Sequence, residues 1–244
     1  MTKAKPAAKH SYAYPRPAVT VDVALVTVVD TDLKVLLIRR GEAPFAGSWA
    51  LPGGFVRVDE SGTQRGETLD AAARRELAEE TGLASDSIYL EQLGAFGAPL
   101  RDPRGRVISI AYCALLDPEL RGTLAVKGKA VLRAGTDAAD ARWFSVAEEV
   151  TRLELAFDHR EILDAALLRL RSRLDTSTVA FELVPPTFTI GELREVFEAI
   201  RGESLDAANF RRRVERMQDD GLIASAPGKR RTGTKPAKVY RFVR

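Results

Sequence analysis

The sequence predicts an α+β protein with two domains, and three observations lead to this fold class. Segments rich in β-branched and apolar residues occur together with helical segments, without strict alternation, as in a mixed sheet covered by helices. Pro185 and Pro186 lie in a stretch typical of a domain boundary. Residues 188–244 hold 13 Lys and Arg against 8 Asp and Glu, whereas everything before them holds 24 against 26. We therefore expect a flexible basic tail (1–17), a large domain (18–174), a linker (175–187) and a basic domain (188–244).

The composition limits the class of protein. With 244 residues, of which 45% are hydrophobic, the chain is long enough to form two cores. No run approaches the ~18 apolar residues of a spanning helix, and the first residues lack the apolar centre of a secretory signal. A cytoplasmic protein without a membrane partner is expected. The single cysteine, Cys113, excludes an internal disulfide, and its apolar neighbours predict that it is buried.

The elements of the large domain follow in order along the chain. Residues 19–29 and 33–40 predict two strands joined by a short polar turn. Residues 69–81 are rich in Ala, Leu, Arg and Glu and predict a helix that ends at Gly82. Three further strands are expected within 87–96, 106–116 and 141–146. A second helix is expected over 158–174, with Asp158 and Glu161 spaced as in a capping box.

The first predicted helix carries a cluster of carboxylates. Glu76, Glu79 and Glu80 stand at i, i+3 and i+4, so a helix presents all three on one face. Such oxygens suit Mg²⁺ or Mn²⁺, and Mg²⁺ is usually held by one or two carboxylates together with waters and substrate phosphates. Arg75 lies four residues before Glu79 and is placed to fix it. The alternative is an exposed helix that carries favourable charge pairs.

This helix and the glycine pair before it resemble the Nudix box. Gly53 and Gly54 form the tight loop of "WALPGGFV", and the second half of the box is matched throughout by Arg75, Glu76, Leu77, Glu79, Glu80, Gly82 and Leu83. The first half fits no single register. Counting forward from Gly54 puts the first glutamate of the box at Glu60, and counting back from Arg75 puts it at Glu67. Seven extra residues, approximately 62–68, separate the halves, and deleting them is expected to restore the family register.

The resemblance covers residues 18–174 and implies a Nudix α/β/α sandwich that binds a nucleoside diphosphate linked to another group. It implies Gly53, Gly54 and Arg75 as ligand-binding residues, with Glu76, Glu79 and Glu80 as metal ligands and, if the site is active, as catalytic groups. The stretch "FGAPLRDPRGRVISIAY" looks like its counterpart in relatives that handle ADP-ribose. Arg101 and Arg104 then contact phosphate or ribose; alternatively, they belong to an ordinary polar turn. Asp158 and His159 are expected to be a helix cap and its neighbour.

The basic domain predicts a winged helix-turn-helix. Residues 188–200 carry a helical apolar stripe, and a second helix follows within 204–221. Two short strands, 222–227 and 238–243, are expected on either side of a basic, glycine-rich turn. The second helix and the turn supply candidate contacts to phosphate and base edges: Asn209, Arg211, Arg212, Arg213, Arg231, Thr232 and Lys235. An interaction module without DNA is the alternative.

The order of the two domains resembles the Nudix-related transcriptional regulators of bacterial NAD metabolism, the NrtR family. The most specific matches are "FTIGELREVFEAI", "NFRRRVERM" and "GTKPAKVYRF". The resemblance implies a dimeric repressor of NAD-biosynthesis or salvage genes that binds a palindromic operator and is controlled by ADP-ribose or a related NAD-derived nucleotide. The competing hypothesis is a Mg²⁺-dependent ADP-ribose diphosphatase with an accessory domain. The stretched box favours weak turnover or none, because small displacements in a positioned site cost rate.

Overall fold

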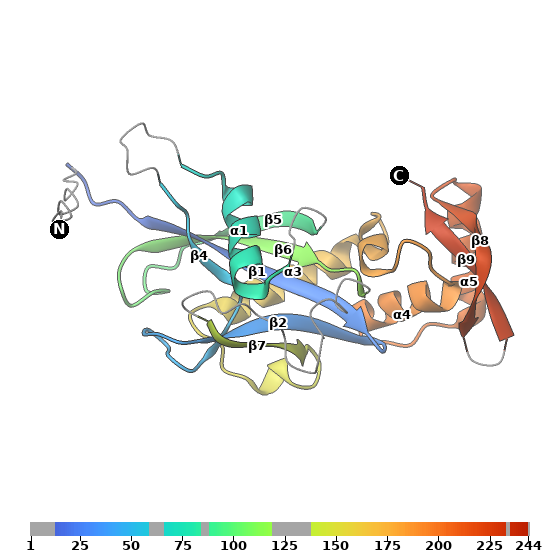
Figure 1. The fold of residues 1–244 in the computed structure, drawn as a ribbon, viewed down its shortest axis with the longest axis horizontal. Coiled ribbons are helices and arrows are strands. Elements are labelled where there is room, and N and C mark those ends of the chain that lie inside the picture. The colour runs from blue at the N-terminus through green and yellow to red at the C-terminus, as the bar shows by residue number, and fades with distance from the viewer. Residues whose placement is uncertain (1–12, 59–65, 84–87, 119–137, 233–234, 244) are drawn as a thin grey trace, which may run out of the picture.

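The computed structural model describes residues 13–58, 66–83, 88–118, 138–232 and 235–243 (Figure 1). Its larger part is a seven-stranded mixed sheet with the main path β3-β2-β1-β6-β5, where β4 pairs with β1 and β7 pairs with β2. The strands are β1 (Ala18–Val29), β2 (Asp32–Arg40), β3 (Trp49–Ala50), β4 (Gly53–Phe55), β5 (Tyr89–Phe96), β6 (Val107–Leu115) and β7 (Ala138–Ser145).

The alternation of side chains along β1 explains why both faces of the sheet are covered. Val21, Val23 and Leu25 pack with Ala72, Ala73 and Leu77 of helix α1 (Leu69–Thr81). Ala24, Val26 and Val28 belong instead to the cluster that contains Ile162, Leu163 and Ala166 of helix α3 (His159–Arg173). The two helices therefore lie on opposite faces (Figure 1), and the predicted α/β/α sandwich is confirmed.

The segment expected to link the domains is a packed joint. Residues 175–187 contain a 3₁₀ helix, η3 (Val179–Leu183), whose Val179, Ala180 and Leu183 are buried. The same hydrophobic cluster continues without interruption from α3 through η3 to Phe197 and Phe210 of the C-terminal part. A continuous apolar core resists independent motion of the parts it joins, so residues 175–187 connect the two parts as packed structure.

The C-terminal part is a helix-turn-helix followed by a hairpin. Helix α4 (Ile190–Arg201) begins at a capping box made by Thr189 and Glu192 and ends at Gly202 in the left-handed conformation. Helix α5 (Ala207–Asp219) begins at Asp206, whose carboxylate accepts the Asn209 N–H at 2.8 Å. The predicted winged helix-turn-helix is thus confirmed.

The wing differs from its prediction in length. Strands β8 (Ile223–Thr232) and β9 (Lys235–Phe242) pair from Ile223–Phe242 to Thr232–Lys235, so most of the expected turn is strand. The sequence pattern suggested a turn because residues 228–237 are basic and rich in glycine. Gly228 lies at the register shift between Ser225 and Lys229 with a φ of 95°. Glycine is needed at this bulge, whereas the basic residues beyond it tolerate extended backbone.

The remaining expectations concern the tail, Cys113 and membrane spans. Residues 1–12 of the predicted tail lie outside the described residues, and 13–17 form no helix or strand. Cys113 is buried as predicted, and burial raises the pKa of its thiol to about 12. Within the described ranges, no helix is long and apolar enough to cross a membrane.

Candidate functional site

Local sequence determines where the carboxylate helix α1 begins and ends. The hydroxyl of Thr68 accepts the Ala71 N–H at 3.2 Å, and Gly82 closes the helix with a φ of 72°. Gly54 leaves room for the Glu76 carboxylate, because a Cβ there would lie 2.4 Å from Glu76 Oε1 and would displace that side chain. The loop of β4 can therefore approach the carboxylate face of α1 closely.

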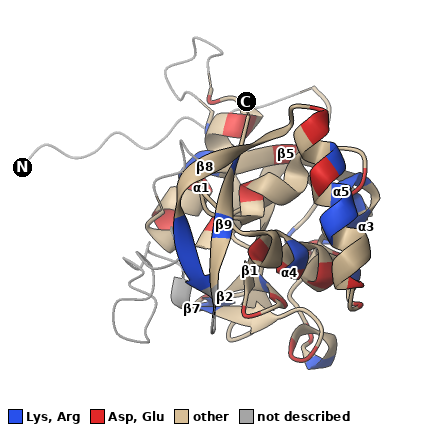
Figure 2. Ribbon diagram, turned by 90° about the vertical axis from the view of Figure 1, so that its right-hand side faces the viewer, with Lys and Arg blue, Asp and Glu red and all other residues tan. Residues whose placement is uncertain are grey.

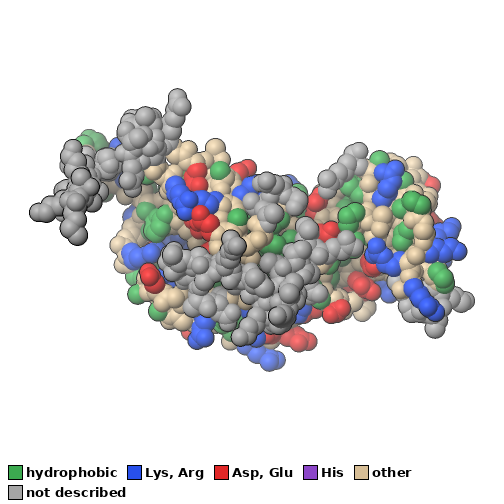
Figure 3. All heavy atoms as spheres, viewed as in Figure 1, with side chains coloured by type: hydrophobic (Ala, Val, Ile, Leu, Met, Phe, Trp, Pro, Cys, Tyr) green, Lys and Arg blue, Asp and Glu red, His purple; other side chains and the backbone are tan. Residues whose placement is uncertain are grey.

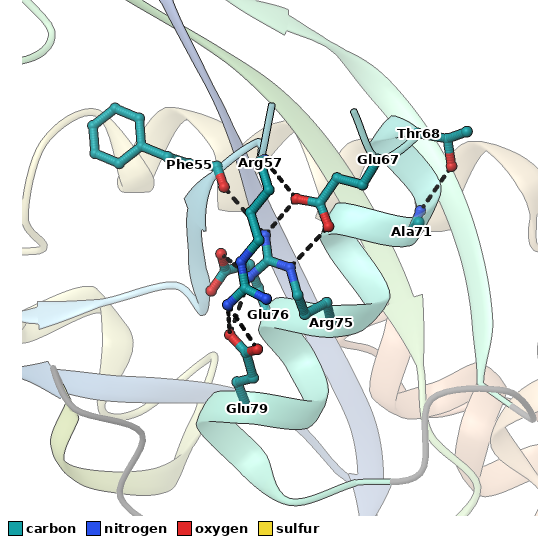
Figure 4. A network of polar contacts seen from close by, with 8 residues as sticks. All are labelled: Phe55, Arg57, Glu67, Thr68, Ala71, Arg75, Glu76 and Glu79. Carbon is teal, nitrogen blue, oxygen red and sulfur yellow. Dashed lines mark hydrogen bonds and ion pairs between the residues drawn. The ribbon is translucent and has the colours of Figure 1, made fainter. Parts of the chain in front are cut away.

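Arg75 organises that face (Figure 4). Its Nε and Nη2 donate to Glu67 at 2.8 and 2.5 Å, and its Nη1 donates to Glu76 at 2.6 Å and to Glu79 at 3.0 Å. The hydrogen bond from Arg75 lowers the pKa of Glu67. Glu67 is thus the glutamate that meets the arginine of the box.

Glu67 therefore decides the register that the sequence left open between Glu60 and Glu67. The N–H of Glu67 donates to the Arg57 carbonyl at 3.1 Å, and its carboxylate accepts the Arg57 N–H at 2.7 Å. Val58 and Gly66 form an antiparallel bridge, so the extra residues are those between these two positions. Glu60 lies outside the described residues. The estimate that the insertion is 62–68 is corrected to a segment before Gly66, because Glu67 and Thr68 hold α1.

Two carboxylates of the cluster, Glu80 and Glu76, are partly withdrawn from water. Glu80 accepts the Gly53 N–H at 2.9 Å, and burial raises the pKa of its carboxyl well above the ordinary value. Burial also raises the pKa of Glu76, and the hydrogen bond from Arg75 opposes this shift. Both groups therefore favour the neutral form more than a solvated glutamate does.

A divalent ion, which the resemblance to the Nudix box implies, does not fit this donor set as it is arranged. Among the described residues, no three Asp, Glu, His or Cys side chains gather closely enough to hold a metal ion. Glu76 and Glu79 accept from Arg75, Glu79 also accepts from Arg57, and Glu80 accepts from the Gly53 backbone. A metal ion needs carboxylate oxygens that are not already neutralised by cations.

The carboxylate face lines a cavity of about 390 Å³, within the range of small-molecule pockets. Strands β1, β2 and β4, helix α1 and the 101–104 turn contribute most of its wall. Charged groups of both signs line it: Asp22, Glu42, Glu76, Glu79, Glu80 and Asp102, with Arg40, Arg57, Arg75, Arg101 and Arg104. The cavity is also lined by Gly53, Gly54, Phe55, Phe157 and His159.

Arg101 lies at the floor of this pocket as a buried brace. It is 8% exposed and donates to both oxygens of Asp158 at 2.8 and 2.6 Å and to Asp22 at 3.3 Å. Ser109 also donates to Asp22, at 2.5 Å. These acceptors occupy most of the donors of the Arg101 guanidinium. Arg101 therefore holds Asp158 and Asp22 in place at the floor of the pocket and is less available to a ligand. Asp158 stands before α3 but makes no side-chain cap hydrogen bond, which corrects the capping-box prediction: its carboxylate pairs with Arg101 instead.

His159 is also part of the pocket, although the sequence pattern assigned it only a place beside a helix cap. Its Nδ1 accepts the Leu51 N–H at 2.8 Å, and its Nε2 lies 3.4 Å from Asp22 Oδ1. Burial lowers the pKa of the imidazole, although Asp22 opposes this shift. A neutral ring with Nε2 protonated satisfies both neighbours.

The upper wall combines arginines with aromatic rings. Arg104 donates to both oxygens of Asp102 at 2.7 to 3.2 Å, and its guanidinium lies 5.3 Å from the Phe55 ring and 5.8 Å from the Phe157 ring. The Arg40 guanidinium lies over the same Phe157 ring, 4.7 Å from its centroid. The predicted Arg104 thus borders the cavity, but Asp102 already holds it.

Sequence reasoning missed several of the residues that line or support this pocket: Asp22, Arg40, Arg57, Phe157 and His159. Asp22 carried a signal, since a carboxylate inside a mostly apolar, buried strand needs a buried partner. The positive φ of 54° at Phe157 is visible only in the folded chain. Arg57 gave no signal, because its partner Glu79 is 22 residues away.

The second candidate site is the surface of α5 and the wing. Figure 2 views this end of the molecule, and basic residues follow α5 and β8. Lys and Arg side chains also gather at this end in Figure 3. Asn209, Arg211 and Arg212 are exposed on α5, and Arg231 is exposed on β8. The backbone of Thr232 and Lys235 closes the described part of the hairpin.

Arg213 differs from its neighbours on α5. Its Nη1 donates to Asp175 at 2.6 Å, and its guanidinium lies 4.5 Å from the Phe197 ring. Arg230 likewise pairs with Glu192 at 2.7 Å and fixes the wing against the start of α4. The structure therefore places Arg213 in the joint between the two parts, while Arg211 and Arg212 remain directed to solvent.

Comparison with known proteins agrees with this division into two parts. Residues 19–166 match the NUDIX domain, and residues 180–242 match the NrtR DNA-binding winged helix domain. The chain is 36% identical over 229 residues to the ADPR responsive transcriptional repressor NtrR of Acinetobacter baylyi. The matched region covers 94% of this chain and 83% of that protein. The chain belongs to the NrtR family.

Solved structures of the NrtR family extend the likeness. Shewanella oneidensis NrtR complexed with a 27mer DNA superposes with a TM-score of 0.74 at 33% identity, over 92% of this chain and 93% of that one. The NUDIX domain of the same NrtR complexed with ADP ribose superposes with a TM-score of 0.52 at 35% identity, over 70% of this chain and 99% of that one.

Proposed function

We propose that this protein is a transcriptional repressor that binds operator DNA through α5 and the β8–β9 wing and releases it when ADP-ribose, or a related NAD-derived nucleotide, occupies the NUDIX pocket. The observation that carries the proposal is the single core that joins a pocket rich in arginines to a winged helix. A ligand that alters the pocket can thereby bias the orientation of the winged helix. Two relatives support it: the ADPR responsive transcriptional repressor of Acinetobacter baylyi and the Shewanella oneidensis NrtR complexed with DNA.

The proposal includes a homodimer on a palindromic operator in front of genes of NAD biosynthesis or salvage. A winged helix-turn-helix reads a short stretch of the major groove, and two-fold symmetry doubles the site. Release then follows if the nucleotide favours a dimer geometry that does not match the spacing of the half-sites. A ~100-fold release requires about 2.7 kcal/mol of coupling between ligand and DNA.

The competing hypothesis is a Mg²⁺-dependent ADP-ribose diphosphatase, favoured by the match of Glu76, Glu79 and Glu80 to the Nudix box. The ion pairs that engage two of these glutamates weigh against it. We therefore infer weak turnover or none, with ADP-ribose acting as an effector.

One experiment separates the two hypotheses. An operator is first selected from random duplex DNA with the full chain. The complex is then titrated with ADP-ribose in a gel-shift assay, with and without Mg²⁺. The nucleotides in the same tubes are then analysed. Loss of the shifted band with intact ADP-ribose is the expected result. Rapid conversion to AMP and ribose phosphate, without any effect on DNA, would establish the enzyme instead.

A further inference from the structure

We propose that Arg57, together with Arg75, supplies the positive charge that a divalent ion supplies in a metal-dependent pocket, so that this protein binds the diphosphate of its nucleotide without a metal ion. The inference rests on the proposed function for the identity of the nucleotide. It assigns Arg57 as a phosphate-binding residue.

The first observation is that arginines already hold the carboxylates that a metal ion would use. Arg57 Nη2 donates to both oxygens of Glu79, at 2.9 and 3.0 Å, and Arg75 Nη1 bridges Glu79 and Glu76 (Figure 4). Arg75 is the stronger competitor, because only 16% of its side chain is exposed. A metal ion that drew Glu76 and Glu79 away would leave a poorly hydrated guanidinium with fewer partners.

The second observation concerns which arginines still have donors for a ligand. Arg75, Arg101 and Arg104 direct their nitrogens at carboxylates or backbone carbonyls. By contrast, the hydrogen bonds that the described residues provide for the Arg57 side chain all leave from Nη2. Its side chain is 61% exposed at the cavity wall, so Nε and Nη1 can turn to phosphate oxygens at little cost.

The third observation is the position of Arg57 on the chain. It follows β4 and exchanges two hydrogen bonds with Glu67, one from each backbone N–H, where the chain enters and leaves the inserted segment. The backbone that carries Arg57 is therefore anchored to the start of α1, while the guanidinium is exposed. An exposed guanidinium on a fixed backbone suits a diphosphate, because the cation is held at the cavity wall while its remaining donors meet phosphate oxygens.

The experiment measures ADP-ribose binding to the full chain by isothermal titration calorimetry, in excess EDTA and in excess MgCl₂. Wild-type affinity should be the same in both buffers. Arg57→Gln should weaken binding in EDTA by about tenfold or more, as expected for the loss of a hydrogen bond to a charged group. Mg²⁺ should restore part of that loss in the variant, since Glu79 then keeps only its contact with Arg75 and one of its oxygens is available to the ion.

Arg142→Gln is the matched control. Arg142 is an arginine of similar exposure, 57%, paired with Glu149 at 3.2 Å on the same domain but outside the pocket. Its substitution should leave ADP-ribose affinity unchanged in both buffers. An equal loss in both variants would overturn the assignment of Arg57.

A second arm uses Mn²⁺ alone, followed by its electron paramagnetic resonance signal. Wild-type protein should leave the ion free, whereas Arg57→Gln should bind it. Wild-type protein that binds ADP-ribose only with Mg²⁺, or that holds Mn²⁺ tightly, would overturn the inference. Failure to bind ADP-ribose in either buffer would instead reject the proposed effector, while the Mn²⁺ arm still decides whether the arginines exclude the ion.

Discussion

Gly53 shows how a single residue positions the pocket. A Cβ at this position would lie 2.3 Å from the Val21 carbonyl oxygen and 3.0 Å from Asp22 Cα, both of them backbone atoms. The N–H of Gly53 also holds Glu80. The residue therefore allows β4 to lie against β1 and brings α1 to the edge of the cavity.

Gly53→Ala should destabilise the fold by about 1–3 kcal/mol, the usual range for an overpacked site, because backbone must move to admit the methyl group. Urea unfolding followed by circular dichroism measures the change. Gly94→Ala is the control, since nothing lies within 4 Å of a Cβ there, and it should stay within about 0.5 kcal/mol. Similar losses in the two variants would show that the contact with Val21 is unimportant.

At the scale of elements, the inserted segment is separable from helix α1. The Glu67 N–H donates to the Arg57 carbonyl at 3.1 Å across the Val58–Gly66 bridge. Deleting residues 59–65 would turn this bond into the i to i+3 hydrogen bond of a β-turn, with Gly66 at a position that tolerates positive φ. Deleting 62–68 removes the same number of residues but also the partner of Arg75 and the cap of α1.

We expect the 59–65 deletion to remain within about 1 kcal/mol of the wild type, since loop length affects stability weakly. The 62–68 deletion should lose about 2–4 kcal/mol through the missing cap and the loss of both hydrogen bonds between Arg75 and Glu67. Chemical denaturation compares the three proteins, and calorimetry tests whether ADP-ribose binding survives in the first. Equal stability of the two deletions would contradict the assignment of Glu67.

Helix α5 carries the expected contacts to DNA, and Arg212 is its test residue. Arg212→Ala should weaken operator binding and lower the slope of log K against log salt by about 0.9, the value for one phosphate contact. Fluorescence anisotropy at several salt concentrations measures both. Arg142→Ala, on β7 of the NUDIX domain, is the control and should change neither. An unchanged slope with Arg212→Ala would remove this residue from the interface.

At the scale of the whole molecule, α3 spans the distance between the two candidate sites. Its first residue, His159, and the preceding Asp158 belong to the floor of the pocket. Just beyond its other end, Asp175 accepts from Arg201 of α4 at 2.8 Å and from Arg213 of α5 at 2.6 Å. A helix of 15 residues is about 22 Å long, so under the proposed function a small tilt at the floor would displace the DNA-binding helices.

Asp175→Asn should therefore reduce the effect of ADP-ribose on DNA affinity, by about two- to thirty-fold if it follows other residues that couple distant sites. The measured quantity is the ratio of DNA dissociation constants with and without ADP-ribose. Glu203→Gln is the matched control, because Glu203 also faces Arg201, at 3.6 Å, but does not bond Arg213. A ratio that is unchanged in Asp175→Asn would exclude this joint from the coupling.

Much of the fold follows from local sequence. Thr68 and Gly82 delimit α1, Thr189 and Glu192 begin α4, and the spacing of Glu76, Glu79 and Glu80 puts them on one face of a helix. These features depend on interactions over a few residues, which the sequence displays directly. The α/β/α sandwich and the winged helix were predictable for this reason, together with the resemblance that the motifs carried.

The tertiary structure alone decided the partners of the charged groups. Arg101 pairs with Asp158, 57 residues away, and so serves the floor of the pocket instead of a turn. Arg57 meets Glu79, and Arg213 meets Asp175, 38 residues away, although each looked like any other basic residue in the sequence. An ion pair depends on distance and burial, both of which are set by long-range packing, so no local pattern could reveal it.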